Sequence, residues 1–183
     1  GSDFYGDLAI DDIRIIEAPS PPTITSFTPA SLCEGATVTI TGTDFTGASS
    51  VTIGGTAATS YTVNSDTEIS AVVGSGTSGT IAMANAVSTG TSSSSLTVNA
   101  NPSAVTVSAA SLCSGSSASL TASGGSGGTI YWQGTSSGGT STANSGTTSP
   151  AYSSAVTYYA VAQSSAGCWG TEGSAALTEV TAP

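Results

Sequence analysis

The chain contains one short phrase twice: residues 31–44 read SLCEGATVTITGTD, and residues 111–124 read SLCSGSSASLTASG. The two cysteines, Cys33 and Cys113, are 113 − 33 = 80 residues apart. A repeat at a fixed spacing indicates successive structural units of one kind. The sequence therefore predicts two compact domains of one general architecture, each opening with the same strand and each about 80 residues long.

The composition restricts the partners that such domains can have. Among 183 residues there is one Arg, Arg14, with no Lys and no His, against 11 acidic residues, which gives a net charge of −10. A field of this sign does not attract nucleic acid or an anionic membrane surface. Charged residues make up only 7% of the chain, against roughly 25% in ordinary globular proteins. This balance, with Ser, Thr and Gly dominant, is typical of secreted bacterial surface repeats.

The hydrophobic residues form alternating runs, which argues against disorder. No stretch approaches the roughly 18 apolar residues of a membrane helix, so we expect no membrane insertion. There is no signal peptide, and the pattern starts abruptly at Gly1 and carries no sorting signal at Pro183. We therefore expect the chain to be an excerpt from a longer protein.

Seven β-branched runs follow the first 22 residues, with turn residues between them. Short strands at intervals of roughly 8–12 residues are the pattern of a β-sandwich. The pair Gly54–Gly55 predicts a two-residue turn with positive φ angles. The runs cover residues 23–27, 37–42, 50–55, 59–64, 68–73, 79–84 and 94–99. The expected core is Phe27, Val38, Ile40, Phe45, Val51, Ile53, Val63, Ile69 and Val72.

The second repeat has the same character and begins after a short linker marked by Pro102. We expect Trp132 and one of Tyr158 and Tyr159 in its core. The segment 135–150, almost wholly Ser, Thr, Gly and Asn, predicts loops with one weak strand. The expected strands are 104–109, 118–123, 129–134, 156–164 and 174–181.

A further strand is expected near the N-terminus, over residues 8–16, where LAIDDIRII alternates. The PSPP segment at 19–22 then ends it, because proline cannot donate to a strand ladder. A single strand is not stable alone. It must pair with the following domain, close a preceding domain, or complete a neighbouring subunit of a fibre.

Candidate chemistry is scarce. The lack of His excludes Ser-His-Asp hydrolysis and His metal sites, and the lack of Lys excludes Schiff-base chemistry and a P-loop. Three Cys without His do not make a usual zinc site. The carboxylates stand mostly alone at predicted turns and strand ends, so we expect no enzyme activity and no cofactor. Asp11 and Asp12 could contribute to a calcium site, although a solvated acid pair at the end of a strand is the simpler explanation.

Three parts of the sequence resemble known families. Residues 22–99, with ITGTDF and VTIGGTAA, look like an IPT/TIG domain. Residues 102–181, with YWQGTSSGG, TYYAVA and GCWG, resemble the Ig-like domains of bacterial adhesins. GDLAIDDI, within residues 6–16, is similar to the last strand of a MAM domain. The resulting all-β chain has two tandem immunoglobulin-like β-sandwiches and an extra N-terminal strand. Its expected parts are a MAM-like strand (1–18), a linker (19–22), an IPT/TIG sandwich (23–100) and an Ig-like sandwich (101–183).

The Ig-like resemblance implies a role for the cysteines, which permit one disulfide and leave one over. In immunoglobulins a buried Trp packs on an inter-sheet disulfide. By this pattern Cys113 pairs with Cys168, and Cys33 stays a free thiol. As alternatives for Cys33 we consider a small buried residue, a crosslink, or a partner in another domain. Trp169 is a candidate contact residue, or it packs over the disulfide.

These resemblances imply a non-catalytic structural or adhesive segment of a large surface protein. Its expected location is the outer surface of a Gram-negative bacterium, reached often through type IX secretion. Its expected partners are other domains of the same chain, surface glycans or proteins, or copies of itself. The alternatives are an accessory module of a secreted hydrolase and a subunit of a self-assembling fibre.

Overall fold

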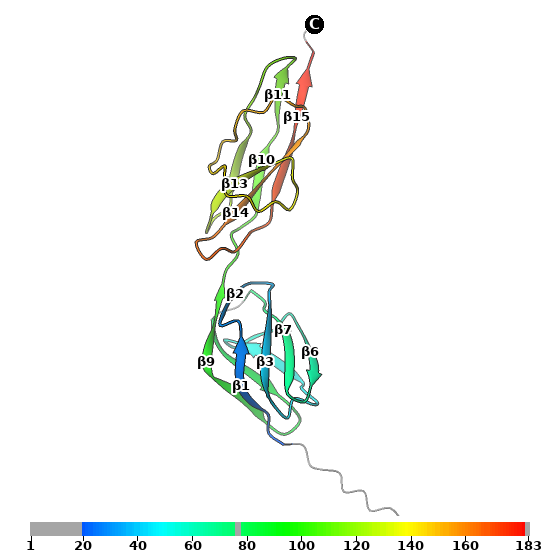
Figure 1. Cartoon of the computed structure of the whole chain (residues 1–183), viewed down its shortest axis with the longest axis vertical. Helices are drawn as coiled ribbons and strands as arrows, with labels where there is room; N and C mark the ends of the chain where they lie inside the picture. Colours follow the sequence, from blue (N-terminus) through cyan, green and yellow to red (C-terminus); the bar gives the residue numbers. More distant parts are fainter. Residues whose placement is uncertain (1–19, 76–77, 182–183) are drawn as a thin grey trace, which may run out of the picture.

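The computed structural model describes residues 20–75 and 78–181, and every regular element in these ranges is a β-strand. The strands form two β-sandwiches that follow one another along the long axis of the molecule (Figure 1). We call them the first sandwich (β1–β9) and the second sandwich (β10–β15). The predicted all-β class is confirmed. The part of the chain described here contains no helix able to cross a membrane, and the predicted strand at 8–16 lies outside it.

The first sandwich has the immunoglobulin arrangement of two facing sheets. One sheet has the order β1-β3-β7-β6 and the other the order β2-β9-β8-β4-β5. All pairs are antiparallel except β2 with β9, which is parallel. Each of the seven predicted runs overlaps a strand. The strands are β1 (Thr23–Thr28), β2 (Ser31–Cys33), β3 (Thr37–Thr43), β4 (Ser50–Ile53), β5 (Thr56–Ala57), β6 (Ser60–Ser65), β7 (Glu68–Val72), β8 (Gly79–Ala84) and β9 (Thr89–Asn99).

The core of this sandwich follows from strand alternation. Because successive side chains point to opposite faces, every second residue of a strand faces the other sheet. Six predicted core residues are buried, and Phe27 and Val63 pack partly buried against them. The prediction for Val72 is wrong: Ile69, Ala71 and Val73 are buried, and Val72 points to the other face. The six buried residues are Val38, Ile40, Phe45, Val51, Ile53 and Ile69.

The predicted glycine turn joins β4 to β5. Gly54 and Gly55 have φ angles of 56° and 83°, and Ile53 pairs with Thr56 across the turn. Both angles lie in the left-handed region, which Gly adopts at little cost. The turn therefore fixes the register of this edge hairpin.

In the second sandwich one sheet has four strands and the other is reduced to two. The larger sheet has the order β11-β15-β14-β13, again with one parallel pair, β11 with β15. The other sheet consists of β10 and β12 alone. The strands are β10 (Val105–Ser108), β11 (Ala110–Cys113), β12 (Thr121–Gly124), β13 (Thr129–Gly134), β14 (Thr157–Gln163) and β15 (Gly173–Val180).

The predicted weak strand within 135–150 is absent from the second sandwich. Isolated bridges such as Thr121↔Thr148 and Tyr131↔Ser145 hold this segment instead. Trp132 is buried, as predicted, and its indole N–H donates to the Gly146 carbonyl at 3.0 Å. Tyr158 is the buried member of the tyrosine pair. A Ser/Thr/Gly loop, bonded to the core Trp, thus takes the place of edge strands.

The SLC of the repeated phrase forms the same local structure in both sandwiches, as part of the second strand and not the first. Leu32 and Leu112 point inward from these strands, at 8% and 6% exposure. A turn follows each cysteine: the Ala36 N–H donates to the Cys33 carbonyl at 3.1 Å, and the Ser116 N–H donates to the Cys113 carbonyl at 3.0 Å. Cys33 and Cys113 therefore occupy equivalent positions.

Candidate functional site

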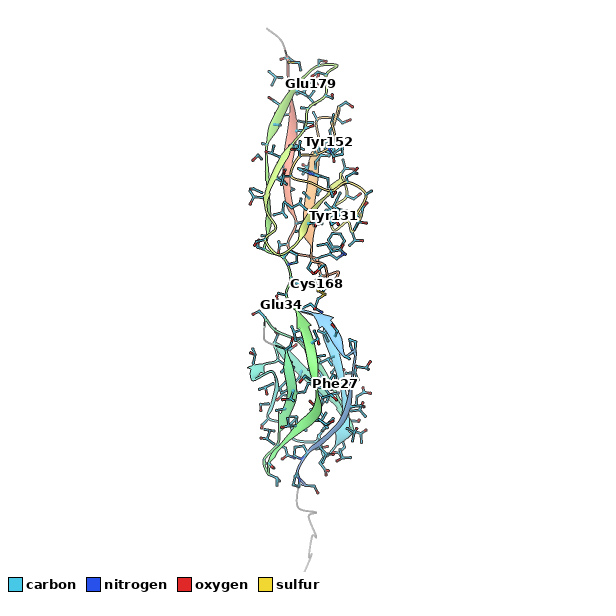
Figure 2. All side chains as sticks on the ribbon, turned by 90° about the vertical axis from the view of Figure 1, so that its left-hand side faces the viewer. Phe27, Glu34, Tyr131, Tyr152, Cys168 and Glu179 are labelled. Carbon is cyan, nitrogen blue, oxygen red and sulfur yellow. A yellow bond between two sulfur atoms is a disulfide. The ribbon has the colours of Figure 1, made fainter. Side chains whose placement is uncertain are left out.

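A disulfide between Cys33 and Cys168 joins the two sandwiches. The Cα atoms are 5.6 Å apart, within the range of ordinary disulfides. Figure 2 shows Cys168 and Glu34, the neighbour of Cys33, close together at the junction. The predicted pair Cys113–Cys168 and the predicted free thiol of Cys33 are both wrong. Cys113 is the free cysteine, and it is exposed.

The register of β15 explains why Cys113 cannot reach Cys168. Cys113 lies opposite Val180, the last residue of β15, whereas Cys168 precedes Gly173, the first. Seven steps of about 3.3 Å separate the two ends of that strand, which amounts to roughly 23 Å. A disulfide requires Cα atoms closer than about 7 Å. Cys113 and Cys168 therefore lie at opposite ends of the second sandwich.

The first sandwich holds the beginning of the linker. The Asn101 side chain donates to the Glu34 carbonyl at 3.2 Å, and the Asn101 N–H donates to Oε2 of Glu34 at 3.4 Å. The Glu34 N–H in turn donates to the Asn99 carbonyl at 3.1 Å. Because Glu34 follows Cys33 directly, the linker and the disulfide start from the same turn.

The second sandwich holds the end of the linker. Pro102 is buried, and a Cβ atom placed on Gly170 would lie 2.5 Å from the Pro102 carbonyl oxygen. Only a glycine leaves room for this close approach. The Ser103 N–H donates to the Ser126 carbonyl at 2.9 Å. With Asn101 bonded to one sandwich and Pro102 packed in the other, the free linker is very short.

A tight loop after β14 positions Cys168. The Cys168 N–H donates to the Ser164 hydroxyl at 3.1 Å, and the Ser164 N–H donates to the Cys168 carbonyl at 2.8 Å. Gly167 closes the loop with a φ of 85°. Cys168 is 1% exposed, and its sulfur lies 3.8 Å from the Asn99 carbonyl oxygen. That contact is no hydrogen bond, because a disulfide sulfur carries no proton.

Trp169 belongs to the same loop and directly follows Cys168. Its ring meets that of Tyr131 edge to face, with centroids 6.0 Å apart, and it is half-buried. Such pairs contribute about 0.5–1.5 kcal/mol beyond their buried area. The contact braces the Cys168 loop against β13. The role of Trp169 as a contact residue for a partner stays a prediction.

Most carboxylates in the described ranges have structural partners. Glu172 accepts hydrogen bonds from the Ser137 hydroxyl at 2.6 Å and from the Gly138 N–H at 2.8 Å. Asp66 accepts from the Thr46 N–H at 3.0 Å, and bonds from the Thr46 hydroxyl and N–H lower the pKa of its carboxyl. No group of three metal-ligating side chains occurs in the ranges the structure describes. Asp11 and Asp12, the predicted calcium ligands, lie outside them.

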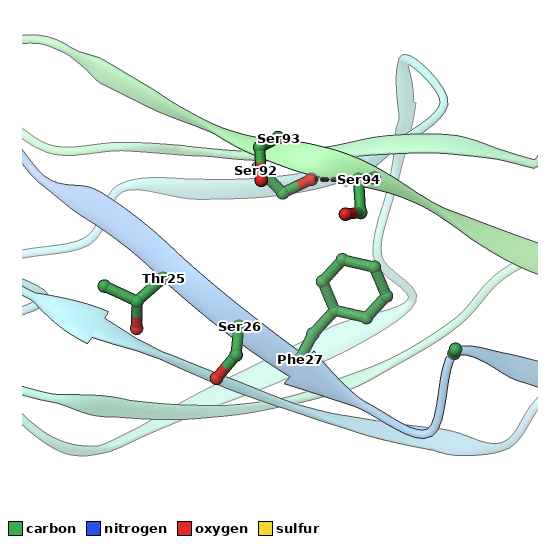
Figure 3. A pocket seen from close by; sticks show the side chains of 7 residues that line it. Thr25, Ser26, Phe27, Ser92, Ser93 and Ser94 are labelled. Atoms are coloured by element: carbon green, nitrogen blue, oxygen red, sulfur yellow. Dashed lines mark hydrogen bonds between the residues drawn. The ribbon is translucent and has the colours of Figure 1, made fainter.

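A shallow groove opens between β1, an edge strand of one sheet of the first sandwich, and β9 of the facing sheet (Figure 3). Its volume is about 230 Å³, below the roughly 300–1,000 Å³ of small-molecule sites. Ser92 in its wall accepts from the Ile81 N–H at 2.9 Å and donates to the Ser94 carbonyl at 2.7 Å, where β8 and β9 shift register. These bonds give Ser92 a structural role. The lining residues are Thr25, Ser26, Phe27, Ala30, Ser92, Ser93 and Ser94.

Residues 100–182 match a family model described as "Ig-like domain CHU_C associated". This match supports the predicted bacterial Ig-like domain. The match does not include residues 22–99 or 6–16, so the IPT/TIG and MAM-like resemblances stay predictions. No curated protein matches the chain.

Several solved structures have segments similar to this chain. An auxiliary nutrient binding protein from Bacteroides thetaiotaomicron is 16% identical over 44% of this chain and 21% of its own, with a TM-score of 0.39. The Bacteroides ovatus SGBP-B of a mixed-linkage glucan utilization locus is 15% identical over 90% and 46%, with a TM-score of 0.33. A gamma-CGTase from alkalophilic Bacillus clarkii is 16% identical over 92% and 28%, with a TM-score of 0.37. The chain spans less than half of each, and these similarities assign it no ligand or activity.

Proposed function

We propose that the chain is a non-catalytic, load-bearing stalk segment of a bacterial surface protein. The observation that carries this proposal is the disulfide between Cys33 and Cys168, which crosses the junction of the two sandwiches. A covalent bond beside a linker that is already held on both sides contributes little to a binding or catalytic site. It contributes much to a structure that is pulled at its ends.

The disulfide changes the path of an applied force. Tension on the two ends of the chain enters at the N-terminal side of Cys33 and leaves on the C-terminal side of Cys168. The bond joins these two points directly, so the 135 residue steps between them carry no tension after the flanking segments extend. Fully stretched, those steps would add roughly 470 Å of chain, at about 3.5 Å per residue. Unfolding under load therefore cannot lengthen the stalk by this amount.

The Cys33–Cys168 disulfide also indicates the compartment in which the protein works. Disulfides persist in oxidising surroundings and are rare in the cytosol of most bacteria. Together with the surface that Ser and Thr dominate, this supports an extracellular position. The resemblances described above lead us to place it on the outer surface of a Gram-negative cell, with other domains of the same chain as its first partners.

The absence of catalysis is part of the proposal. In the described ranges Glu34, Glu172 and Asp66 serve the linker, a loop and a turn, respectively. Acid–base hydrolysis of glycosides requires two carboxylates that face one another across a cleft. The groove beside Phe27 contains hydroxyls but no titratable side chain.

Single-molecule force spectroscopy tests the mechanical role. The full chain, attached at its two ends, is pulled in oxidising buffer and compared with the variant Cys33→Ser. We expect the variant to release roughly 470 Å more contour length than the oxidised chain. Addition of a reductant should convert the first behaviour into the second.

The variant Cys113→Ser is the matched control, because it removes a cysteine without removing the bond. It should extend as the unmodified chain does. If the oxidised chain and Cys33→Ser release the same contour length at the same force, the bond carries no load and the proposal fails.

A further inference from the structure

We propose that Cys113 is the first half of a second interdomain disulfide, which it forms with an Ig-like domain joined after Pro183. The acceptor is a loop cysteine equivalent to Cys168 on that domain. This inference extends the proposed stalk by one junction. It starts from the structural equivalence of Cys33, which is bonded, and Cys113, which is free and exposed.

Each of the two cysteines pairs with the last residue of the final strand of its sandwich. Cys33 on β2 lies opposite Asn99, the last residue of β9, in a parallel pair. Cys113 on β11 lies opposite Val180, the last residue of β15, also in a parallel pair. In both cases the cysteine therefore stands beside the point at which the chain exits.

The turns after the two cysteines agree as well. Gly35 and Gly115 stand two residues after the cysteines, with φ angles of 81° and 76°. Each turn is closed by a hydrogen bond to the cysteine carbonyl, at 3.1 Å and 3.0 Å. Such a turn requires a positive φ at its third residue, which Gly supplies. The local backbone that presents the Cys33 sulfur to the next domain is thus built again at Cys113.

The spacing to the following proline is the same at both exits. Pro102 comes three residues after Asn99, and Pro183 comes three residues after Val180. At the first junction this proline packs beside Gly170, in the segment that carries Cys168. A second-type domain entered through Pro183 would bring its own loop cysteine to the same place relative to Cys113.

A second copy of this chain is a poor acceptor. Its Cys168 is already bonded to its own Cys33 and is 1% exposed. The first sandwich is no acceptor either, because residues 85–88, which join β8 to β9, contain no cysteine. Val180, opposite Cys113, is 51% exposed, and a following domain is the neighbour that would cover it. These facts favour a domain of the second type in the same chain.

Bond formation needs an oxidant, for which a small-molecule disulfide suffices. The Cys113 thiolate attacks one sulfur of oxidised glutathione and releases one glutathione thiolate. The acceptor cysteine then attacks the mixed disulfide at the Cys113 sulfur and releases the second glutathione. The two cysteines lose two protons and two electrons, and one disulfide becomes two thiols. The short tether favours the second step, since it confers an effective concentration in the millimolar range.

The test is a tandem protein in which a copy of residues 103–181 follows Pro183. Cys113 of the copy is changed to Ser, so that its single cysteine is the Cys168 equivalent. After oxidation with a glutathione buffer, cleavage at aromatic and Glu residues separates every cysteine on its own peptide. We expect two linkages, Cys33 with Cys168 and Cys113 with the appended cysteine, and no thiol open to alkylation.

Two controls define the result. With Cys113→Ser in the parent part, the appended cysteine should become the one alkylated thiol. With a Cys33→Ser copy of the first sandwich (residues 23–99) appended instead, Cys113 should stay alkylated. Alkylation of both Cys113 and the appended cysteine in the tandem protein overturns the proposal, and so does any other partner for Cys113. The Cys33–Cys168 peptide is read separately, so the stalk proposal and this one can fail independently.

The unmodified chain provides a measurement that does not depend on folding of the appended copy. With excess oxidised glutathione, Cys113 should take up one glutathione, while Cys33 and Cys168 remain bonded to each other. A Cys113 thiol that fails to react in the folded chain would overturn the inference, because a buried thiol could not bond to a following domain.

Discussion

The two sandwiches share one topology and differ in how they close it. The first has two complete sheets, of four and five strands. The second keeps one four-stranded sheet, and the loop between β13 and β14 takes the place of two strands of the other. Side-chain hydrogen bonds hold that loop: Gln133 both donates to and accepts from Ser141, at 2.9 and 2.8 Å, and Glu172 binds Ser137 and Gly138. The fold thus tolerates the loss of strands if a few polar side chains take over their bonds.

The difference predicts which sandwich depends most on one residue. Trp132→Ala should destabilise the second sandwich by about 3–5 kcal/mol, the usual cost of an emptied aromatic site. The loss of its bond to Gly146 adds to this and frees the loop. A domain of this size has little stability to spare, so we expect it to unfold at 25 °C. Fluorescence of Trp169 reports on it, and the NMR signal of the buried Met83 methyl reports on the first sandwich.

Phe45→Ala is the mirror-image variant in the first sandwich, where Phe45 is fully buried. It should disturb Met83 and leave the fluorescence of the second sandwich as it was. If either variant unfolds both sandwiches together, the chain is one cooperative unit and the comparison breaks down.

A smaller effect is expected from the loop itself. Gln133→Ala removes the two part-buried hydrogen bonds to Ser141, at about 1 kcal/mol each, so the second sandwich should lose about 2 kcal/mol. Amide exchange at Ser141 should quicken, because its N–H loses its acceptor. Gln163→Ala on the neighbouring strand is the control, since the Gln163 side chain makes one long hydrogen bond, at 3.3 Å to the Gly167 carbonyl. Equal melting temperatures for the two variants would show that the loop does not depend on Gln133.

The smallest effect is on acid sensitivity, and it belongs to the first sandwich. Hydrogen bonds from Thr46 lower the pKa of Asp66 from its usual value of 3.8. A carboxyl whose pKa is lowered in the folded state stabilises the fold at pH values above its pKa in the unfolded chain. This stabilisation disappears as the pH falls through the folded-state pKa. Asp66→Asn should therefore lower the melting temperature slightly at pH 7 and lose that difference near pH 2. A difference that persists at pH 2 would contradict this explanation.

The strands could be predicted from the sequence because alternation records burial directly. In β3 every second residue from Val38 is buried, as the pattern TVTITG indicates. The same rule would have corrected the core prediction in β7, since Ile69 and Val72 are an odd number of residues apart and cannot share a face. The loop at 135–150 could not be resolved in this way. Its order comes from Trp132, Gln133 and Glu172, which lie elsewhere in the sequence.

The disulfide shows what the sequence pattern left out. The immunoglobulin pattern led to Cys113, although the repeat already placed Cys113 and Cys33 in equivalent positions. A bond within the second sandwich would have no counterpart in the first, which has one cysteine only. A bond across the junction needs no such counterpart. Pro102 marked the linker in the sequence, but Asn101 and Glu34, which hold its beginning, gave no signal of their own, because their partners are set by the ends of the strands.

The Cys33–Cys168 bond also affects what happens to the molecule after proteolytic cleavage. Any single cut between these residues leaves the two fragments joined through sulfur, and that interval includes the exposed Ser- and Gly-rich loop after β13. A nicked molecule would migrate as one band without reductant and as two with it. Damage in this exposed loop would leave everything distal to the cut attached to the rest of the chain.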